Sequence, residues 1–330
     1  MRFLLTGTGS IGRRHLGNLR QLFPRARIDL LSSRGRALEC PAEATRVVTS
    51  LEESLADGLD AALVASPAPF HVATCRSLLE AGVSVLVEKP LSDTLDGVAS
   101  LRETARLRNR VLMVGYTLRF HRAVRALQDA LRAEAIGRVL SAQFQVGQYL
   151  PDWRPSADYR ETVSARRDLG GGALLELSHE IDYAQTLLGP IVQVAALTGR
   201  ISSLEIDVED CADLLVRFAG GTQASIHLDF LDRAPFRGCR LVGTDGTLEW
   251  DAAAQEVRQY RPASRDWVVL ISTVGADRNE MYLAQLRHFF SAIETGTDSL
   301  ATAEGAYSTL QVIEAARRSA AAGTLVEVSR

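Results

Sequence analysis

The chain begins with a short apolar run that leads into a glycine-rich turn, Arg2-Phe3-Leu4-Leu5-Thr6-Gly7-Thr8-Gly9-Ser10-Ile11-Gly12. The next residues, from about Ile11 to Leu22, have the apolar spacing of an amphipathic helix. A strand, a GxGxxG turn and a helix in this order are typical of the phosphate-binding unit of a parallel sheet. Gly7 permits the tight turn, Gly9 lets the backbone approach a pyrophosphate, and Gly12 permits close packing of helix on strand. The residues expected at a bound dinucleotide are Gly7, Gly9, Ser10, Ile11 and Gly12. A turn without function and a site for another nucleotide are the alternatives.

The rest of the first third continues this pattern. Apolar runs at about 27–31, 61–65, 83–87 and 111–114 alternate with helical patterns. This alternation predicts βαβ units and a doubly wound parallel sheet of the Rossmann type. The first domain is expected to span residues 1–118.

The chain changes character after Arg119. Residues 191–270 read mainly as strands, and Thr222–Phe230 alternates apolar and polar side chains with a period of two. We expect an α+β domain with a mainly antiparallel open sheet over residues 119–330. For the last helix, at about 303–321, packing on the first domain is the alternative.

The composition limits the function. The chain has 330 residues, 46% of them apolar, and a formal net charge of −3. These values predict two globular domains without general affinity for nucleic acid or an anionic membrane. The apolar residues at the start of the sequence are not followed by a signal-peptide cleavage site, so they are predicted to form a strand rather than a signal peptide. We expect a cytoplasmic protein.

Metal binding is not expected. Cys40, Cys75, Cys211 and Cys239 are scattered, with no CxxC pair, so neither a zinc site nor a disulfide framework is predicted. The histidines His121, His227 and His288 lack acidic or cysteine partners at metal-ligand spacing.

The end of the second predicted strand bears on the choice of cofactor. An acidic residue about 20 positions past the glycines holds the ribose 2′-hydroxyl in NAD-binding domains. Here the stretch reads Ser32-Ser33-Arg34, with Asp29 still inside the strand. Hydroxyls and an arginine suit a 2′-phosphate, so we expect NADP, with NAD as the alternative.

One lysine stands out. Lys89 is the single lysine in the chain, and the other 36 of its 37 basic residues are arginine. Where arginine supplies every other positive charge, a retained lysine indicates a position that needs a compact ammonium group. Lys89 lies in Glu88-Lys89-Pro90, after an apolar strand, where ligands of parallel sheets bind. An ammonium there can stabilise a developing alkoxide.

A second polar group lies in the segment that follows Gly170-Gly171-Gly172. On a continuous helix, Glu176, His179 and Tyr183 project on one side by their i, i+3, i+7 spacing. A histidine beside a carboxylate can move protons near neutral pH. A satisfied structural histidine is the alternative.

Several ordered motifs resemble the Gfo/Idh/MocA oxidoreductases. They are GTGSIGRRH at 7–15, ASPAPFH at 65–71, EKP at 88–90, GYTLRF at 115–120 and GGGALLELSHEID at 170–182. The resemblance implies that Lys89 and His179 are the catalytic pair. It also implies that further cofactor contacts come from Ser66, His71, Glu88, Lys89, Tyr116 and Arg119.

The chain departs from the family pattern at one position. Leu175 stands where the family often has an aspartate, four residues before the histidine. Glu176 is the nearest carboxylate, as a ligand of a substrate hydroxyl or as the group that orients His179.

An arginine-rich, aromatic loop over about residues 151–169 is predicted to form a wall of the substrate site, although a solvated loop is the alternative. The expected substrate contacts are Tyr149, Arg160, Arg166, Glu176, Asp182 and Tyr183.

These features predict an NAD(P)-dependent dehydrogenase that acts on a secondary alcohol or ketone of a sugar, inositol or nucleotide sugar. Non-redox use of the cofactor, by an epimerase or eliminase, and a catalytically silent dinucleotide sensor are the alternatives. The family resemblance also implies a homodimer or homotetramer formed through the open sheet.

Overall fold

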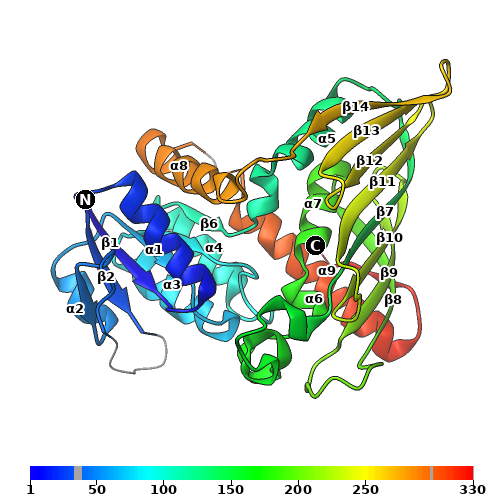
Figure 1. Ribbon diagram of the computed structural model, residues 1–330. Coiled ribbons are helices and arrows are strands. Elements are labelled where there is room, and N and C mark those ends of the chain that lie inside the picture. Colours follow the sequence, from blue (N-terminus) through cyan, green and yellow to red (C-terminus); the bar gives the residue numbers. More distant parts are fainter. Residues whose placement is uncertain (33–38, 298–299, 330) are drawn as a thin grey trace. The chain divides into compact units, whose positions relative to one another are not determined.

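The computed structural model describes residues 1–32, 39–297 and 300–329. The chain forms two compact units, one of residues 1–117 with 278–307, and one of residues 118–277 with 308–330 (Figure 1). The segment 278–307 thus packs with the first unit, whereas the sequence analysis placed all of 119–330 in the second domain.

A six-stranded parallel sheet forms the core of the first unit. Its order is β3-β2-β1-β4-β5-β6, and each neighbouring pair is parallel. The strands are β1 (Arg2–Thr6), β2 (Arg27–Leu31), β3 (Arg46–Val48), β4 (Ala61–Val64), β5 (Ser84–Val87) and β6 (Leu112–Val114). The order reverses between β1 and β4, so ligands are expected beyond the carboxyl ends of these two strands. The predicted Rossmann fold is confirmed.

Helices pack in pairs against this sheet. Helix α1 packs on α8, and α3 packs on α4. The helices of the first unit are α1 (Ser10–Leu22), α2 (Leu51–Ala56), α3 (His71–Glu80), α4 (Val98–Leu107) and α8 (Glu280–Thr295), with a 3-10 turn η1 (Ala68–Phe70). Phe290 of α8 lies against Phe3 and Phe23, with ring centroids 5.1 and 4.6 Å apart. This aromatic cluster joins the returning segment to the first strand and helix.

The second unit is built on a nine-stranded sheet of order β14-β13-β12-β11-β7-β10-β9-β8-β15. All its pairs are antiparallel except β7 with β10. The strands are β7 (Val139–Gly147), β8 (Ile191–Gly199), β9 (Cys211–Phe218), β10 (Gln223–Asp229), β11 (Phe236–Gly243), β12 (Thr247–Asp251), β13 (Glu256–Arg261), β14 (Asp266–Ser272) and β15 (Val326–Glu327). The predicted, mainly antiparallel sheet is confirmed.

Helices cover one face of this sheet and leave the other open (Figure 1). They are α5 (Arg122–Arg132), α6 (Ala173–Glu176), α7 (His179–Leu188) and the part of α9 (Ala303–Ala322) that belongs to the second unit. Short 3-10 turns are η2 (Thr117–Phe120), η3 (Leu150–Trp153), η4 (Tyr159–Glu161), η5 (Val163–Ala165) and η6 (Arg167–Leu169). In β10, Ala224, Ile226 and Leu228 are buried, as their period of two predicts. No helix in the described ranges has the length and apolar character to cross a membrane.

Candidate active site

The glycine-rich turn lies where the sheet order reverses. Gly7 follows β1 with φ of +89°, and a Cβ there would lie 2.3 Å from the carbonyl oxygen of Ala65, which follows β4. A Cβ on Gly12 would lie 2.1 Å from the Gly7 oxygen. Both distances are far below van der Waals contact, so both positions require glycine. A Cβ on Gly9 would meet no heavy atom within 4 Å.

The start of α1 suits a phosphate group. Gly9 is the N-cap of α1, and it provides no side-chain hydrogen bond to the first amides. The first turn of α1, which contains Ser10 and Ile11, carries no acidic residue. Helix N-termini with unsatisfied amides attract anions. The residues here therefore fit the pyrophosphate of a dinucleotide.

Two buried hydroxyl groups at this edge also support binding of a ligand here. The side-chain oxygens of Thr6, which ends β1, and Ser66, beyond β4, are buried and have no hydrogen-bond partner among the described residues. Buried hydroxyls without partners are uncommon in folded proteins. A bound ligand is a natural partner for such groups.

His71 connects two of the loops at this edge. It is 1% exposed; its Nδ1 lies 2.9 Å from the Pro90 oxygen and its Nε2 lies 2.7 Å from the Ser66 oxygen. Burial lowers the pKa of His71, while hydrogen bonds to these carbonyls oppose the shift. Both ring nitrogens are engaged with the backbone, so His71 positions the loops rather than offering a nitrogen to a ligand.

Glu88 and Lys89 follow β5 at the same edge. Glu88 is buried, and its Oε1 accepts a hydrogen bond from His15 Nε2 of α1 at 2.8 Å. Its other oxygen lies 3.2 Å from the Lys89 amide nitrogen. Lys89 is half-buried. Glu88 thus joins His15 of α1 to the backbone of the single lysine, through a contact between residues 73 positions apart that no local sequence pattern predicts.

Of four further expected cofactor positions, the structure describes Tyr116 and Ser32. Tyr116 follows β6 at this edge and is 1% exposed. Ser32 follows β2 and is half-buried. Ser33 and Arg34, on which the expectation of NADP depends, lie outside the described residues.

The predicted helix after the three glycines is broken in the second unit. It forms two pieces, α6 and α7, which are separated at Leu177 and Ser178. His179 begins α7 and is half-buried, while Glu176 ends α6. Glu176 accepts a hydrogen bond of 2.7 Å from the hydroxyl of Ser164. Sequence reasoning missed this partner because it lies in the preceding loop.

The structure contradicts the prediction that Tyr183 projects on the same side as Glu176 and His179. Its side chain is fully buried, and its hydroxyl donates to the Gly238 oxygen at 3.3 Å. Its ring packs against Phe144 and Trp250. Because the helix breaks before His179, the i, i+7 relation to Glu176 does not hold, and Tyr183 belongs to the core.

Asp182 and Arg119 pair with each other. The Arg119 guanidinium donates to both carboxylate oxygens of Asp182, at 2.9 and 2.6 Å. The two side chains are 13% and 0% exposed. Burial raises the pKa of Asp182, although the charge and hydrogen bonds of Arg119 oppose this shift. The sequence predicts Arg119 at the cofactor and Asp182 at the substrate, whereas the structure joins them in one buried ion pair.

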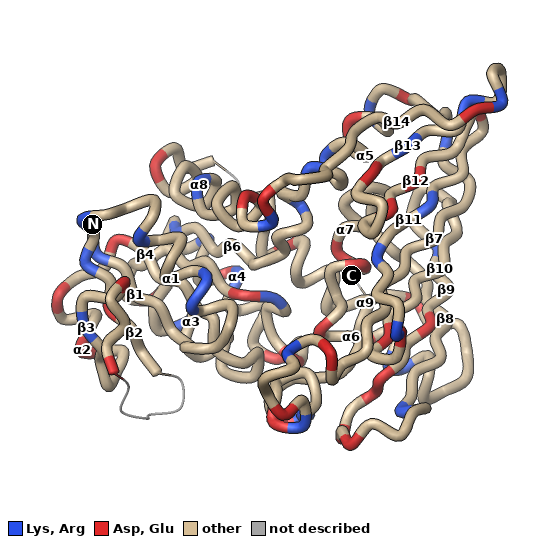
Figure 2. The backbone as a smooth tube through the Cα atoms, viewed as in Figure 1, with Lys and Arg blue, Asp and Glu red and all other residues tan. Residues whose placement is uncertain are grey.

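The arginines of the loop after β7 are locally neutralised. Arg160 pairs with Asp158 and Glu205, and Arg166 pairs with Asp168 and Glu161. Figure 2 shows acidic and basic positions side by side along this loop. Both arginines line an open cleft of about 660 Å³ together with Arg200, and three carboxylates, of Asp168, Glu205 and Asp207, line it as well. The cleft thus lacks the excess positive charge that a site for an anionic group needs.

Tyr149, the remaining expected substrate contact, lies just after β7. The guanidinium of Arg233 lies 3.4 Å from the centre of its ring. This stacked contact leaves the phenol half-exposed.

Two family models match the chain. The model described as an oxidoreductase family with an NAD-binding Rossmann fold matches residues 1–116, and the model of the GFO/IDH/MocA C-terminal domain matches residues 124–249. The chain belongs to the Gfo/Idh/MocA oxidoreductases. The first match lies within the first unit and the second match lies within the second unit, and each agrees with the fold of that unit.

Individual proteins resemble nine-tenths or more of the chain. A 1,5-anhydro-D-fructose reductase of Ensifer adhaerens is 29% identical over 309 residues, which cover 90% of this chain and 88% of that protein. The crystal structure of GenD2 from gentamicin A biosynthesis, in complex with NAD, is 27% identical with a TM-score of 0.81, and the match covers 100% of this chain and 97% of that one. Levoglucosan dehydrogenase in complex with NADH and levoglucosan has a TM-score of 0.87 at 22% identity, over 100% and 99% of the two chains, which shows the shared fold.

Proposed function

We propose that this Gfo/Idh/MocA oxidoreductase transfers a hydride between a nicotinamide dinucleotide and a secondary alcohol or ketone of a sugar, inositol or nucleotide sugar. The observation that carries the proposal is Lys89, the single lysine, half-buried at the same carboxyl edge as the glycine-rich turn. The printed names of the relatives, a reductase of 1,5-anhydro-D-fructose and a levoglucosan dehydrogenase, support sugar-like substrates. We assign dinucleotide binding to the first unit, and substrate binding and oligomerisation to the second.

We assign separate roles to the proposed catalytic groups. A nicotinamide dinucleotide, when bound, would supply the hydride acceptor for the carbinol carbon in the oxidation direction. His179 accepts the hydroxyl proton as that carbon becomes a carbonyl, and the Lys89 ammonium stabilises the developing oxyanion. Glu176 acts as a ligand for a substrate hydroxyl or orients His179, and its hydrogen bond from Ser164 fixes its carboxylate.

We also propose that the cofactor is NADP. The hydroxyls of Ser32 and Ser33 and the guanidinium of Arg34 are groups that can bind a 2′-phosphate. Asp29 is not placed to hold a ribose 2′-hydroxyl instead. Asp29 is 2% exposed and receives two hydrogen bonds from Arg46 and one from Ser54. Its carboxylate is therefore held inside the unit.

The test is a screen of sugars, inositols and nucleotide sugars with NAD and NADP in parallel, followed by the absorbance of the reduced cofactor. The expected result is turnover with one substrate class and a lower KM for NADP. Turnover of none, with cofactor binding intact, contradicts the dehydrogenase proposal and favours the sensor. Cofactor retained through purification without net redox change favours an epimerase or eliminase.

Variants then test the assigned roles. Lys89→Arg keeps the charge but replaces the compact ammonium, and we expect kcat to fall at least about 100-fold with cofactor affinity maintained. His179→Gln is expected to lower kcat by about 100- to 10,000-fold. Arg106→Lys on the exposed surface of α4 and His288→Gln are the matched controls. Wild-type turnover by Lys89→Arg contradicts the argument from the single lysine.

We propose that the open face of the nine-stranded sheet mediates a homodimer or homotetramer. By the strand register, Leu197, Leu215, Val242 and Val269 all lie on this face, and they are 77, 66, 38 and 50% exposed. Clustered apolar side chains on one exposed face are typical of interfaces. Light scattering of the wild type and of Leu215→Arg tests this proposal, and an unchanged mass contradicts it.

A further inference from the structure

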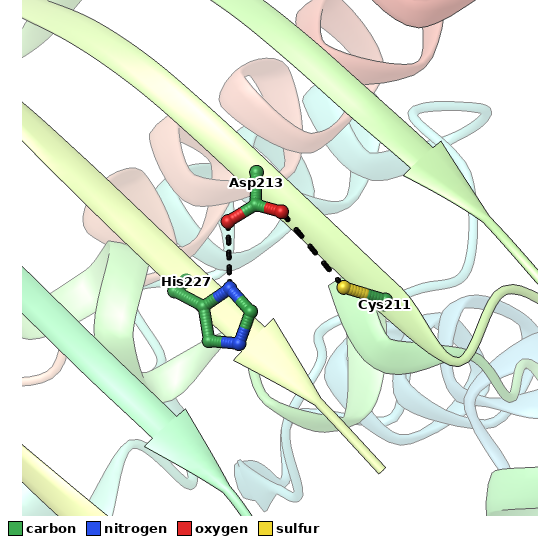
Figure 3. A group of neighbouring side chains, drawn as sticks. All are labelled: Cys211, Asp213 and His227. Atoms are coloured by element: carbon green, nitrogen blue, oxygen red, sulfur yellow. Dashed lines mark hydrogen bonds and ion pairs between the residues drawn. The ribbon is translucent and has the colours of Figure 1, made fainter. Parts of the chain in front are cut away.

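Four side chains with metal-binding chemistry form a square on β9 and β10. Cys211 and Asp213 are two residues apart on β9, and His227 and Asp229 are two apart on β10. The antiparallel register pairs Asp213 with His227 and Cys211 with Asp229. Because side chains alternate between faces, all four lie on one face of the sheet. The cluster shown in Figure 3 brings together Cys211, Asp213 and His227.

The potential ligand atoms converge. One atom each from Cys211, Asp213 and His227 lies within 4.8 Å of the others. His227 Nδ1 is 2.6 Å from one Asp213 oxygen, and Cys211 Sγ is 3.9 Å from the other. A zinc ion holds sulfur at about 2.3 Å and nitrogen or oxygen at about 2.0–2.2 Å, so its ligand atoms lie roughly 3–4 Å apart. Small side-chain rotations suffice to bring the three atoms to that spacing.

Asp229 has the position of an orienting carboxylate. Its Oδ2 lies 2.9 Å from His227 Nε2, on the far side of the ring from Asp213. Its Oδ1 accepts hydrogen bonds from the amides of Leu231 and Asp232, at 2.6 and 2.8 Å. A fixed carboxylate on one ring nitrogen keeps the lone pair of the other nitrogen available, the arrangement that supports metal-bound histidines.

The charge of the cluster also favours a cation. Asp213 and Asp229 both contact His227. A single imidazole cannot balance these carboxylates, whereas a divalent ion together with the Cys211 sulfur can. Cys211 is 8% exposed and the Asp213 side chain is 58% exposed, so a bound ion is covered on one side and accessible on the other.

We propose that Cys211, Asp213 and His227 bind one divalent transition-metal ion, with Zn²⁺ as the preferred metal. The combination of sulfur, nitrogen and oxygen ligands suits Zn²⁺ better than the all-oxygen preference of Mg²⁺ or Ca²⁺. The fourth position is left to solvent, and Asp229 orients His227. The site takes its ligands from one chain and does not depend on the proposed reaction. It lies beside Leu197 and Leu215 on the open sheet face that is proposed as the oligomer interface.

This inference revises the sequence analysis, which expected no metal and judged His227 to lack partners. The cysteine and one aspartate are 16 and 14 residues away along the chain, which no short ligand motif spans. Only the register of β9 against β10 brings them to His227.

The test uses untagged, reduced, chelator-treated full-length protein and a Co²⁺ titration. Co²⁺ occupies zinc sites and gives a thiolate-to-metal charge-transfer band when a cysteine is a ligand. We expect this band to saturate at one equivalent, and added Zn²⁺ to abolish it. Absence of saturable one-equivalent binding overturns the proposal.

Variants separate the ligands from their surroundings. Cys211→Ser is expected to abolish the band, and Asp213→Asn, at an exposed position that should not affect folding, to weaken binding at least about 10-fold. Asp229→Asn is expected to keep the band and weaken binding about 10- to 100-fold. Cys40→Ser and Asp129→Asn, both at exposed positions, are the matched controls. A band that persists in Cys211→Ser, or is lost equally in Cys40→Ser, places the metal elsewhere and overturns the proposal.

Discussion

The buried pair of Arg119 and Asp182 makes a quantitative prediction. Replacing Arg119 with methionine leaves the Asp182 carboxylate charged and 0% exposed with its principal counter-ion removed. Removing one partner of a buried ion pair costs about 3–5 kcal/mol. The alternative is protonation of a carboxyl group whose ordinary pKa is 3.8, which costs about 4 kcal/mol at pH 7. Both routes predict a loss of about 4 kcal/mol in the free energy of unfolding.

The same substitution predicts the direction in which the free energy of unfolding changes with pH. Without Arg119 the folded-state pKa of Asp182 rises further above its unfolded value, so the folded state binds the extra proton. Its stability then falls as the pH rises through the window between the two pKa values. The deficit of Arg119→Met relative to wild type should therefore shrink as the pH falls below 7, by at most about 1.4 kcal/mol for each pH unit.

The assay is urea unfolding followed by tryptophan fluorescence. All three tryptophans, Trp153, Trp250 and Trp267, lie in the second unit with the ion pair, so the signal reports that unit. Asp182→Asn in the Arg119→Met background should restore part of the lost stability, because it removes the buried charge. Arg132→Met, at an exposed pair on α5, is the control and should change stability by less than about 0.5 kcal/mol. A loss below about 1 kcal/mol in Arg119→Met, or strictly additive single effects, refutes the reasoning.

Three further changes test the first unit. Gly12→Ala places a methyl group against the Gly7 oxygen, so we expect loss of dinucleotide binding and about 1–3 kcal/mol of stability, measured by calorimetric titration and thermal unfolding; unchanged affinity contradicts the turn geometry. His15→Leu leaves the buried Glu88 without this hydrogen bond, and differential scanning calorimetry should show about 1–3 kcal/mol of destabilisation. Burial raises the pKa of the Cys75 thiol above its ordinary value of 9.0, so the folded state keeps a proton that the unfolded state loses. Stability should therefore fall above pH 9, and Cys75→Ala should fall less steeply by about 1.4 kcal/mol per pH unit in circular dichroism; parallel curves exclude a role for this thiol.

Features encoded by neighbouring residues could be predicted from the sequence. The strand, the glycine turn and α1 are contiguous, and Glu88-Lys89 follows a strand whose direction the βαβ pattern defines. The carboxyl-edge placement of Lys89 therefore follows from local pattern and the handedness of crossovers.

Features that depend on register or long-range pairing could not be predicted in this way. Arg119 and Asp182 are 63 residues apart, and each looked like a ligand contact when read alone. The apolar stripe around Leu177 continues across the break between α6 and α7, so periodicity predicted one helix where two form. The catalytic role of His179 stays a prediction.

The return of residues 278–307 to the first unit has a consequence for how the chain folds during synthesis. Phe290 covers Phe3 and Phe23, and it leaves the ribosome only after residues 118–277 have been made. Until then the nascent parallel sheet exposes an aromatic surface that a chaperone or a neighbouring chain can bind. A fragment cut at Thr117 keeps this exposed surface permanently, so an isolated dinucleotide-binding domain requires the distant segment to be joined back to it.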